Sequence, residues 1–187
     1  LGGLDRLRKT ADRSGIVDGL NAFEEQAFNL VLGKAPEAFD LKKEDPRTVA
    51  KYGGGLGSSL LLARRLCEAG CGFVTLSYGG WDMHGNIQKS MNGRGPVVDR
   101  AVSAFVDDIY QRGLGENILL VITGEFGRTP KINKNNGRDH WAPLSTLALA
   151  GGGLKMGQTI GESDDKVYRP KTCLLYTSPS PRDATRS

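Results

Sequence analysis

The 187-residue sequence is poor in the features that mark several classes of protein. Its three cysteines are too few for a disulfide framework. We interpret Cys67 and Cys71, which lie near an expected helix end, as packed thiols, with a metal-ligand pair or a disulfide as alternatives. No apolar run approaches the roughly 20 residues that a membrane-spanning helix needs. No secretory signal is visible, but the chain begins at Leu1 and not at Met, so this absence excludes little.

The chain also has no large excess of positive or negative charge. The formal net charge is +4, and basic residues are interleaved with acidic ones along the chain. This pattern is typical of a solvated mixed surface, so we expect no nucleic-acid partner. With 39% hydrophobic and 25% charged residues, the composition fits a folded globular protein, and the length suits one domain. The sequence carries no signal for the oligomeric state.

The first third of the chain shows helical periodicity. Apolar residues recur at helical spacing in residues 4–11 and 23–31, and Pro36 and Pro46 separate the helices. A further helix is expected from about Ser58 to Ala69, where Gly70 is a natural stop. The glycine cluster of residues 53–57 faintly resembles a phosphate loop, but it lacks the Lys-Ser/Thr ending and is read as a turn and helix cap. Residues 1–70 are therefore expected to be mainly helical.

The pattern then becomes α/β. Residues 72–78 and 117–123 are apolar runs rich in strand-forming residues, and an amphipathic helix with apolar positions from Val98 to Ile109 separates them. The second run is nearly continuous, as in a strand covered on both faces of a parallel sheet. A third strand is expected from Leu144 to Ala150. Residues 71–172 thus predict a right-handed βαβ unit of a partial parallel sheet with flanking helices. Further strands are expected in a part that precedes this chain.

The two histidines of the chain each lie beside an aspartate and a tryptophan. Asp82 and His84 follow the first expected strand, and Glu125 follows the next. Ligands of open α/β sheets bind at the carboxyl ends of strands, so these side chains should meet at one edge. The loop after Pro130 could bring Asp139 and His140 back over that edge.

A set of carboxylates and imidazoles suits a divalent metal. Zinc is the first expectation, manganese also suits such a mixed set, and magnesium or calcium are alternatives if oxygen ligands dominate. Arg128 offers a planar fork for an anionic substrate oxygen. The alternative is a hydrogen-bonded structural cluster without a metal. A serine triad is not expected, because no serine has a nearby histidine.

From Cys173 the character of the sequence changes. Residues 173–187 lose periodicity and gain serine and proline, and they resemble one reading frame of a transposase adapter used in preparing sequencing libraries. A natural tail rich in proline and serine is the alternative. We expect this segment to be non-native and disordered, and we expect it to have no part in the function.

Several phrases together resemble one family, the domain of unknown function 1501, found in planctomycetes and related environmental bacteria. They include Gly80-Trp-Asp-Met-His84, Gly124-Glu-Phe-Gly-Arg-Thr-Pro130 and Gly137-Arg-Asp-His-Trp141. The resemblance covers about residues 1–172. Many members of that family are longer and begin with a twin-arginine export signal, so the resemblance implies an exported protein (periplasmic or extracellular) of which this chain is a fragment.

That family is in turn similar to the alkaline phosphatase and sulfatase superfamily, which implies an alkaline-phosphatase-like fold and a divalent-metal site. Carried over, Asp82, His84 and His140 look like ligands of one metal, and Glu125 like a ligand of a second, where the superfamily usually has Asp-His. Asp139 would be a ligand or a partner that orients His140. Arg128 and Arg138 would bind the substrate.

The resemblance implies a metal-dependent hydrolase of phosphate or sulfate esters, with a small anionic ester as substrate, including one carried on a polysaccharide. The superfamily's nucleophile would lie in the preceding part, so this fragment alone is not expected to be active. One alternative is a non-catalytic exported protein that keeps the fold and binds polysaccharide or a protein. An intracellular phosphate-transferring mutase is another.

Overall fold

A computed structural model describes residues 35–171 of the protein. The chain divides into two compact units, one of Leu1–Gly79 with Gly95–Leu114 and one of Gly80–Arg94 with Gly115–Ser187. The helices expected before residue 35 and the adapter-like segment 173–187 lie outside the described residues. Within the described part, no helix combines the length and the apolar character that crossing a membrane requires.

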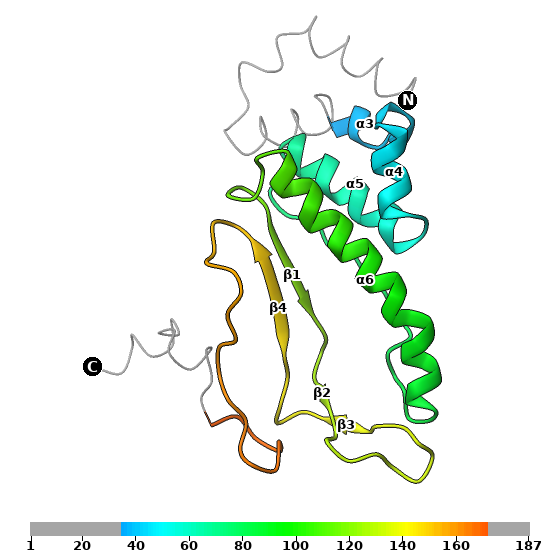
Figure 1. Ribbon diagram of the computed structural model, residues 1–187, viewed down its shortest axis with the longest axis vertical. Coiled ribbons are helices and arrows are strands. Elements are labelled where there is room, and N and C mark those ends of the chain that lie inside the picture. Colours follow the sequence, from blue (N-terminus) through cyan, green and yellow to red (C-terminus); the bar gives the residue numbers. More distant parts are fainter. Residues whose placement is uncertain (1–34, 172–187) are drawn as a thin grey trace, which may run out of the picture. The chain divides into compact units, whose positions relative to one another are not determined.

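The first unit is helical. Its elements are α3 (Ala35–Ala38), the 3-10 helix η2 (Leu41–Lys43), α4 (Pro46–Tyr52), α5 (Leu56–Glu68) and the C-terminal part of α6 (Ile87–Gln111) (Figure 1). Asp45 caps α4, because its side chain accepts a hydrogen bond from the Arg47 backbone N–H at 2.8 Å and Pro46 occupies the first turn. The helices expected at residues 58–69 and around residues 98–109 are confirmed.

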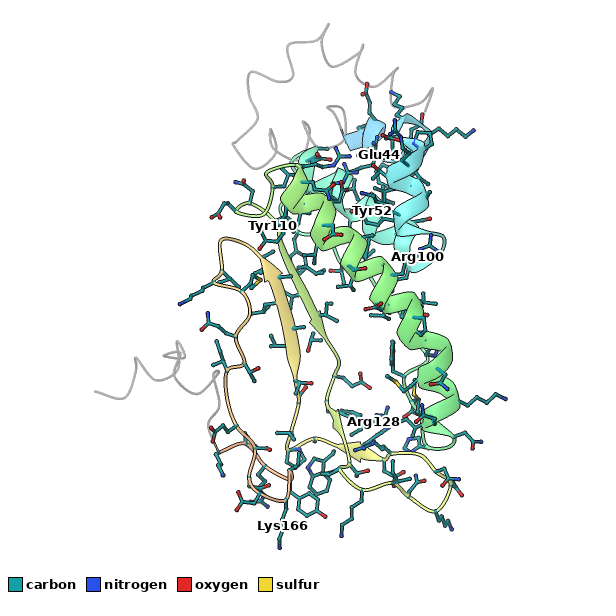
Figure 2. The ribbon with its side chains drawn as sticks, viewed as in Figure 1. Glu44, Tyr52, Arg100, Tyr110, Arg128 and Lys166 are labelled. Carbon is teal, nitrogen blue, oxygen red and sulfur yellow. The ribbon has the colours of Figure 1, made fainter. Side chains whose placement is uncertain are left out.

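The core of this unit combines apolar and charged side chains. Leu61 and Ile109 are fully buried, and Phe105 is 3% exposed. Arg64 is 1% exposed and forms ion pairs with Glu44, Glu68 and Asp108. The Tyr52 hydroxyl donates a hydrogen bond to Asp108 at 2.9 Å, so residues from α4, α5 and α6 share one buried polar network. Figure 2 labels Glu44 and Tyr52 in this unit.

The second unit contains two short antiparallel ribbons. Strand β1 (Leu119–Thr123) pairs with β4 (Leu147–Gly151), and β2 (Gly127–Arg128) pairs with β3 (His140–Trp141) (Figure 1). The strands expected at residues 117–123 and 144–150 are thus present. Strand β1 begins two residues later than expected, and β4 begins three residues and ends one residue later than expected. The first two turns of α6 also belong to this unit, and the boundary between units falls between Arg94 and Gly95, next to Pro96 inside the helix.

The predicted parallel sheet is wrong for the described residues, whose strand pairs are all antiparallel. The expected first strand, residues 72–78, is not a strand, and Phe73 is 89% exposed. The βαβ unit is therefore absent from residues 35–171. Strand β1 was expected to be buried on both faces, yet Val121 is 50% exposed, because a ribbon of two strands covers neither of its own faces.

Candidate metal centre

Three side chains of the second unit converge on one point. Asp82 and His84 come from the extended segment before α6, and His140 opens strand β3. One ligand atom from each residue lies within 4.8 Å of the other two. The sequence had paired each histidine with a neighbouring aspartate, and the structure brings the two motifs together across 56 positions of the chain.

The distances at this point are short. The Nε2 atoms of His84 and His140 lie 3.2 Å apart. Asp82 Oδ1 lies 2.9 Å from the Nε2 of His84 and 2.8 Å from the Nε2 of His140. The three atoms thus form a nearly equilateral triangle, and each imidazole Nε2 either donates a proton or presents a lone pair to it, depending on the tautomer.

This triangle fits one face of a zinc coordination tetrahedron. Zinc–nitrogen bonds are about 2.0–2.1 Å long, so two nitrogen ligands of tetrahedral zinc lie about 3.3 Å apart. The observed 3.2 Å between the imidazole nitrogens is close to that value. The carboxylate oxygen is closer to both rings and would have to move outward by only a few tenths of an ångström. In the tautomers that present both Nε2 lone pairs to this point, a bound cation would relieve the repulsion between them.

A polar partner fixes the orientation of His84. Its Nδ1 lies 2.9 Å from Asp139 Oδ1, so an Nδ1–H that donates to this carboxylate leaves Nε2 free as a ligand atom. Asn133 Nδ2 also donates to Asp139 Oδ1, at 2.9 Å, and to the His84 backbone carbonyl, at 3.0 Å. The Asn133 side-chain oxygen accepts the Asn135 and Gly137 backbone N–H groups. This one amide therefore ties the loop of residues 133–139 to the segment that carries His84.

Backbone contacts join the same two segments. The Arg138 N–H donates to the Met83 carbonyl at 2.9 Å, and Gly85 and Asn136 form an antiparallel bridge. The approach is so close that a Cβ at Gly137 would lie 2.1 Å from the carbonyl carbon of His84. Only glycine fits there, which gives a physical reason for the glycine of the Gly-Arg-Asp-His-Trp phrase.

The aromatic surroundings hold His140. The Phe126 ring lies 4.5 Å from the His140 ring, centroid to centroid. Next in the chain, Trp141 donates its indole N–H to the Tyr168 carbonyl at 2.7 Å, and the two rings are 5.2 Å apart. The segment around Tyr168 thus holds strand β3 through Trp141.

The electrostatics favour an ionised carboxylate at the centre. Hydrogen bonds from His140 and Arg128, together with the nearby His84 and Arg128 charges, hold the pKa of Asp82 at about 2, although desolvation opposes this. A hydrogen bond with His84, then one from Asn133, also lowers the pKa of Asp139. Both carboxylates are thus charged at neutral pH. The Asp82 side chain is 64% exposed and that of His140 is 51% exposed, so solutes can reach the centre.

The arginines predicted to bind substrate lie at or beside the centre. Arg128 Nη1 is 2.7 Å from Asp82 Oδ1, and Arg128 faces His140 in the β2–β3 register (labelled in Figure 2). Arg138 instead donates to the Thr129 and Pro130 carbonyls, at 2.7 and 3.0 Å. Its role in substrate binding stays a prediction, and its visible role is to shape the loop.

The two other predicted ligands, Asp139 and Glu125, do not belong to the triangle of Asp82, His84 and His140. Asp139 contacts His84, not His140, and reaches the triangle only through that ring. Glu125 is exposed and makes no hydrogen bond or ion pair with residues 35–171. Its assignment to a second metal stays a prediction.

Sequence reasoning missed Asn133, Phe126 and Tyr168. Phe126 lies in a quoted motif, directly before Gly127, and could have been proposed as a ring partner. Asn133 is one of several asparagines in a polar loop, and Tyr168 lies 27 positions after Trp141 in a segment without a motif. Nothing in the sequence alone separates these two from their neighbours.

A family model described as "Protein of unknown function (DUF1501)" matches residues 3–176. No curated protein and no solved structure matches this chain.

Proposed function

The chain belongs to the DUF1501 family of proteins of unknown function, and we propose that its second unit supplies a divalent-metal site to a hydrolase of phosphate or sulfate esters. Asp82, His84 and His140 would bind the metal, with zinc as the first candidate. Magnesium, manganese or calcium are less suited to a site with two imidazole ligands. Export of the protein stays a prediction.

One observation carries the proposal, namely the triangle of Asp82 Oδ1 and the two imidazole Nε2 atoms. Structural zinc sites are usually closed by four protein ligands, whereas catalytic sites keep three and leave the fourth position to water or substrate. The triangle has three ligands, and its side chains are about half exposed. This arrangement supports a reactive centre more than a purely structural one.

The surrounding residues suit an anionic ester. A bound metal would polarise an ester oxygen or activate a water molecule. Arg128 lies beside Asp82 and presents a guanidinium, which can bind two oxygens of a phosphate or sulfate group. Asp139 and Asn133 hold the His84 ring, and Phe126 packs on the His140 ring, so the ligands need little rearrangement to bind.

Zinc titration of the 187-residue chain tests the metal site. We expect one zinc ion per chain by calorimetry and elemental analysis, and a loss of affinity of at least about 100-fold in His140→Ala. Asp165→Asn, which removes an exposed carboxylate outside the centre, is the matched control and should bind as the parent does. Equal zinc affinity in the parent and His140→Ala would remove the basis of the proposal.

The reaction is tested on a full-length member of the family, loaded with zinc, using 4-nitrophenyl phosphate and 4-nitrophenyl sulfate. Hydrolysis of one ester that disappears on the substitution equivalent to His140→Ala is the expected result. Zinc binding without hydrolysis of either ester, or of larger phosphate and sulfate esters, would favour the alternative of a non-catalytic binding protein.

A further inference from the structure

Two neighbouring segments of the second unit carry positive charge only. They are residues 86–92, around the start of α6, and residues 130–138, in the loop between β2 and β3 (Figure 1). Backbone hydrogen bonds hold them together, among them the bond from the Ile87 N–H to the Asn136 carbonyl at 2.8 Å. The two segments contain three lysines and one arginine, and neither contains an aspartate or a glutamate. The chain as a whole has mixed charge, so this excess of positive charge is local.

The lysines of the two segments are available to a partner. Lys89, Lys131 and Lys134 are exposed, and their side chains make no hydrogen bond or ion pair within residues 35–171. Arg138 is different, because its guanidinium donates to two backbone carbonyls of its own loop. The three ammonium groups therefore form the part of this surface that can attract an anion from outside the chain.

Exposed apolar side chains lie among these lysines. Ile132 is 50% exposed and stands between two lysines of the loop. Met91 is 42% exposed and lies one helical turn after Ile87. Ile87, Lys89 and Ile132 line one open hollow between the two segments, so cationic and apolar groups share one surface.

From this combination we propose that the two segments dock on the surface of a bilayer that contains anionic lipids. Lysines close to such a bilayer are attracted to its negative headgroups, and apolar side chains beside them enter the boundary between headgroups and acyl chains. Lys89, Lys131 and Lys134 supply the attraction, and Ile132 supplies the apolar contact. The inference goes beyond the proposed function and does not depend on a bound metal.

Soluble polyanions fit this surface less well. Single-stranded nucleic acid is bound by aromatic side chains that stack on its bases, and the two segments contain no aromatic residue. A soluble polyanion of any other kind would pair with the lysines but would leave Ile132 and Met91 in water. A bilayer instead offers an apolar layer directly beneath its anionic one, which matches both kinds of side chain.

Flotation of the 187-residue chain with lipid vesicles tests the inference. Vesicles of phosphatidylcholine and phosphatidylglycerol in equal parts are compared with vesicles of phosphatidylcholine alone. A chelator is present throughout, so that no metal ion bridges the protein and the lipid phosphates. We expect binding to the anionic vesicles only, and this binding should weaken as salt is added, because salt at 0.1 M screens exposed charges beyond about 10 Å.

A double lysine variant tests the electrostatic part. Lys131→Gln/Lys134→Gln should bind the anionic vesicles at least about tenfold more weakly, because two of the three cations are lost. The matched control is Lys155→Gln/Lys166→Gln, which removes two exposed lysines of the same unit outside the two segments. This control should bind as the parent does.

An isoleucine variant tests the apolar part. Ile132→Ser should weaken binding to the anionic vesicles about tenfold, because serine gains little from leaving water. Ile160 is 64% exposed in the same unit, so Ile160→Ser is the control and should bind as the parent does. A loss of binding in the lysine variant with no change in Ile132→Ser would overturn the assignment to a bilayer and favour a soluble polyanion.

Three further results would overturn the inference. They are the absence of flotation with anionic vesicles, equal flotation with and without phosphatidylglycerol, and tighter binding of a single-stranded RNA hexamer than of anionic vesicles at the same salt concentration. Zinc titration of the same variants measures the metal site separately. Zinc affinity should be unchanged in all of them, because none of the substituted side chains belongs to the candidate centre.

Discussion

Gly137 is the residue at which the close approach of the two ligand-bearing segments can be tested directly. Its missing side chain leaves room for the His84 backbone, since a Cβ would lie 2.1 Å from the His84 carbonyl carbon. We expect Gly137→Ala to push these segments apart and to weaken zinc binding at least about tenfold, measured by calorimetry, although alanine touches no ligand.

A matched glycine serves as the control. Gly124 lies in the same unit, and the nearest atom to a Cβ there is the Phe126 carbonyl oxygen at 3.8 Å, an ordinary contact. Gly124→Ala should therefore bind zinc as the parent does. If both variants keep full affinity, the close approach at Gly137 does not position the ligands.

The ligand residues could be predicted from sequence because histidine is rare in this chain and each one stands beside an aspartate and a tryptophan. The arrangement of the ligands was predicted for a different reason, namely that parallel strands end at one edge. The structure reaches the same meeting of Asp82, His84 and His140 through antiparallel pairing of irregular segments. Asn133 could not be predicted, because its function depends on a fold that places its amide between two loops.

At the scale of elements, the sequence predicted helices better than strands. The helix at residues 58–69 is visible in the sequence because its apolar positions recur within one continuous segment, and α5 runs from Leu56 to Glu68. Residues 72–78 have the composition of a strand, but a strand also needs a partner that its own sequence does not name. Within the described residues β1 pairs with β4, and residues 72–78 take part in no strand pair.

Ion pairs of Glu44 link η2, α5 and α6. These ion pairs predict that the free energy of unfolding depends on pH. Glu44 follows η2, its side chain is 7% exposed, and it accepts from Arg64, Arg65 and Arg112. Burial alone would raise the pKa of Glu44, but the hydrogen bonds from Arg64 and Arg65 and the charges of Arg64 and Arg112 outweigh it and lower the pKa from 4.5 to about 2. The ionised carboxylate therefore stabilises the folded state above pH 4.5, and this contribution is lost as the pH falls from 4.5 towards 2.

We expect Glu44→Gln to lower the free energy of unfolding by about 3 kcal/mol at pH 7, because it removes the carboxylate that Arg64, Arg65 and Arg112 share. The difference from the parent should shrink as the pH falls below 4.5, and urea unfolding followed by the helical circular dichroism signal measures both. Glu37→Gln, whose exposed side chain is 3.6 Å from Lys43, is the control and should cost at most about 0.5 kcal/mol. A Glu44→Gln penalty that does not change with pH would show that the charge of Glu44 does not stabilise the helices.

At the scale of the whole molecule, the buried contacts and the ligand set belong to different units. The helical unit holds most of the buried apolar side chains, among them Leu61, Phe105 and Ile109. The second unit has short two-stranded ribbons with exposed faces and a centre in which charged and imidazole groups crowd together. Short ribbons are marginally stable by themselves, so the second unit has the most to gain from a bound ion.

This difference predicts where zinc acts. A ligand that binds only the folded form at 100 times its dissociation constant stabilises that form by about 2.7 kcal/mol. We expect zinc to slow amide hydrogen exchange in residues 82–87 and 133–141, whose backbone groups pair around the centre, and to leave α4 and α5 unchanged. Amide hydrogen exchange is measured by mass spectrometry with and without zinc, with His140→Ala as the control. One experiment then gives the protection of both units. Equal protection of α4 and α5 on adding zinc, or protection that persists in His140→Ala, would contradict a site confined to the second unit.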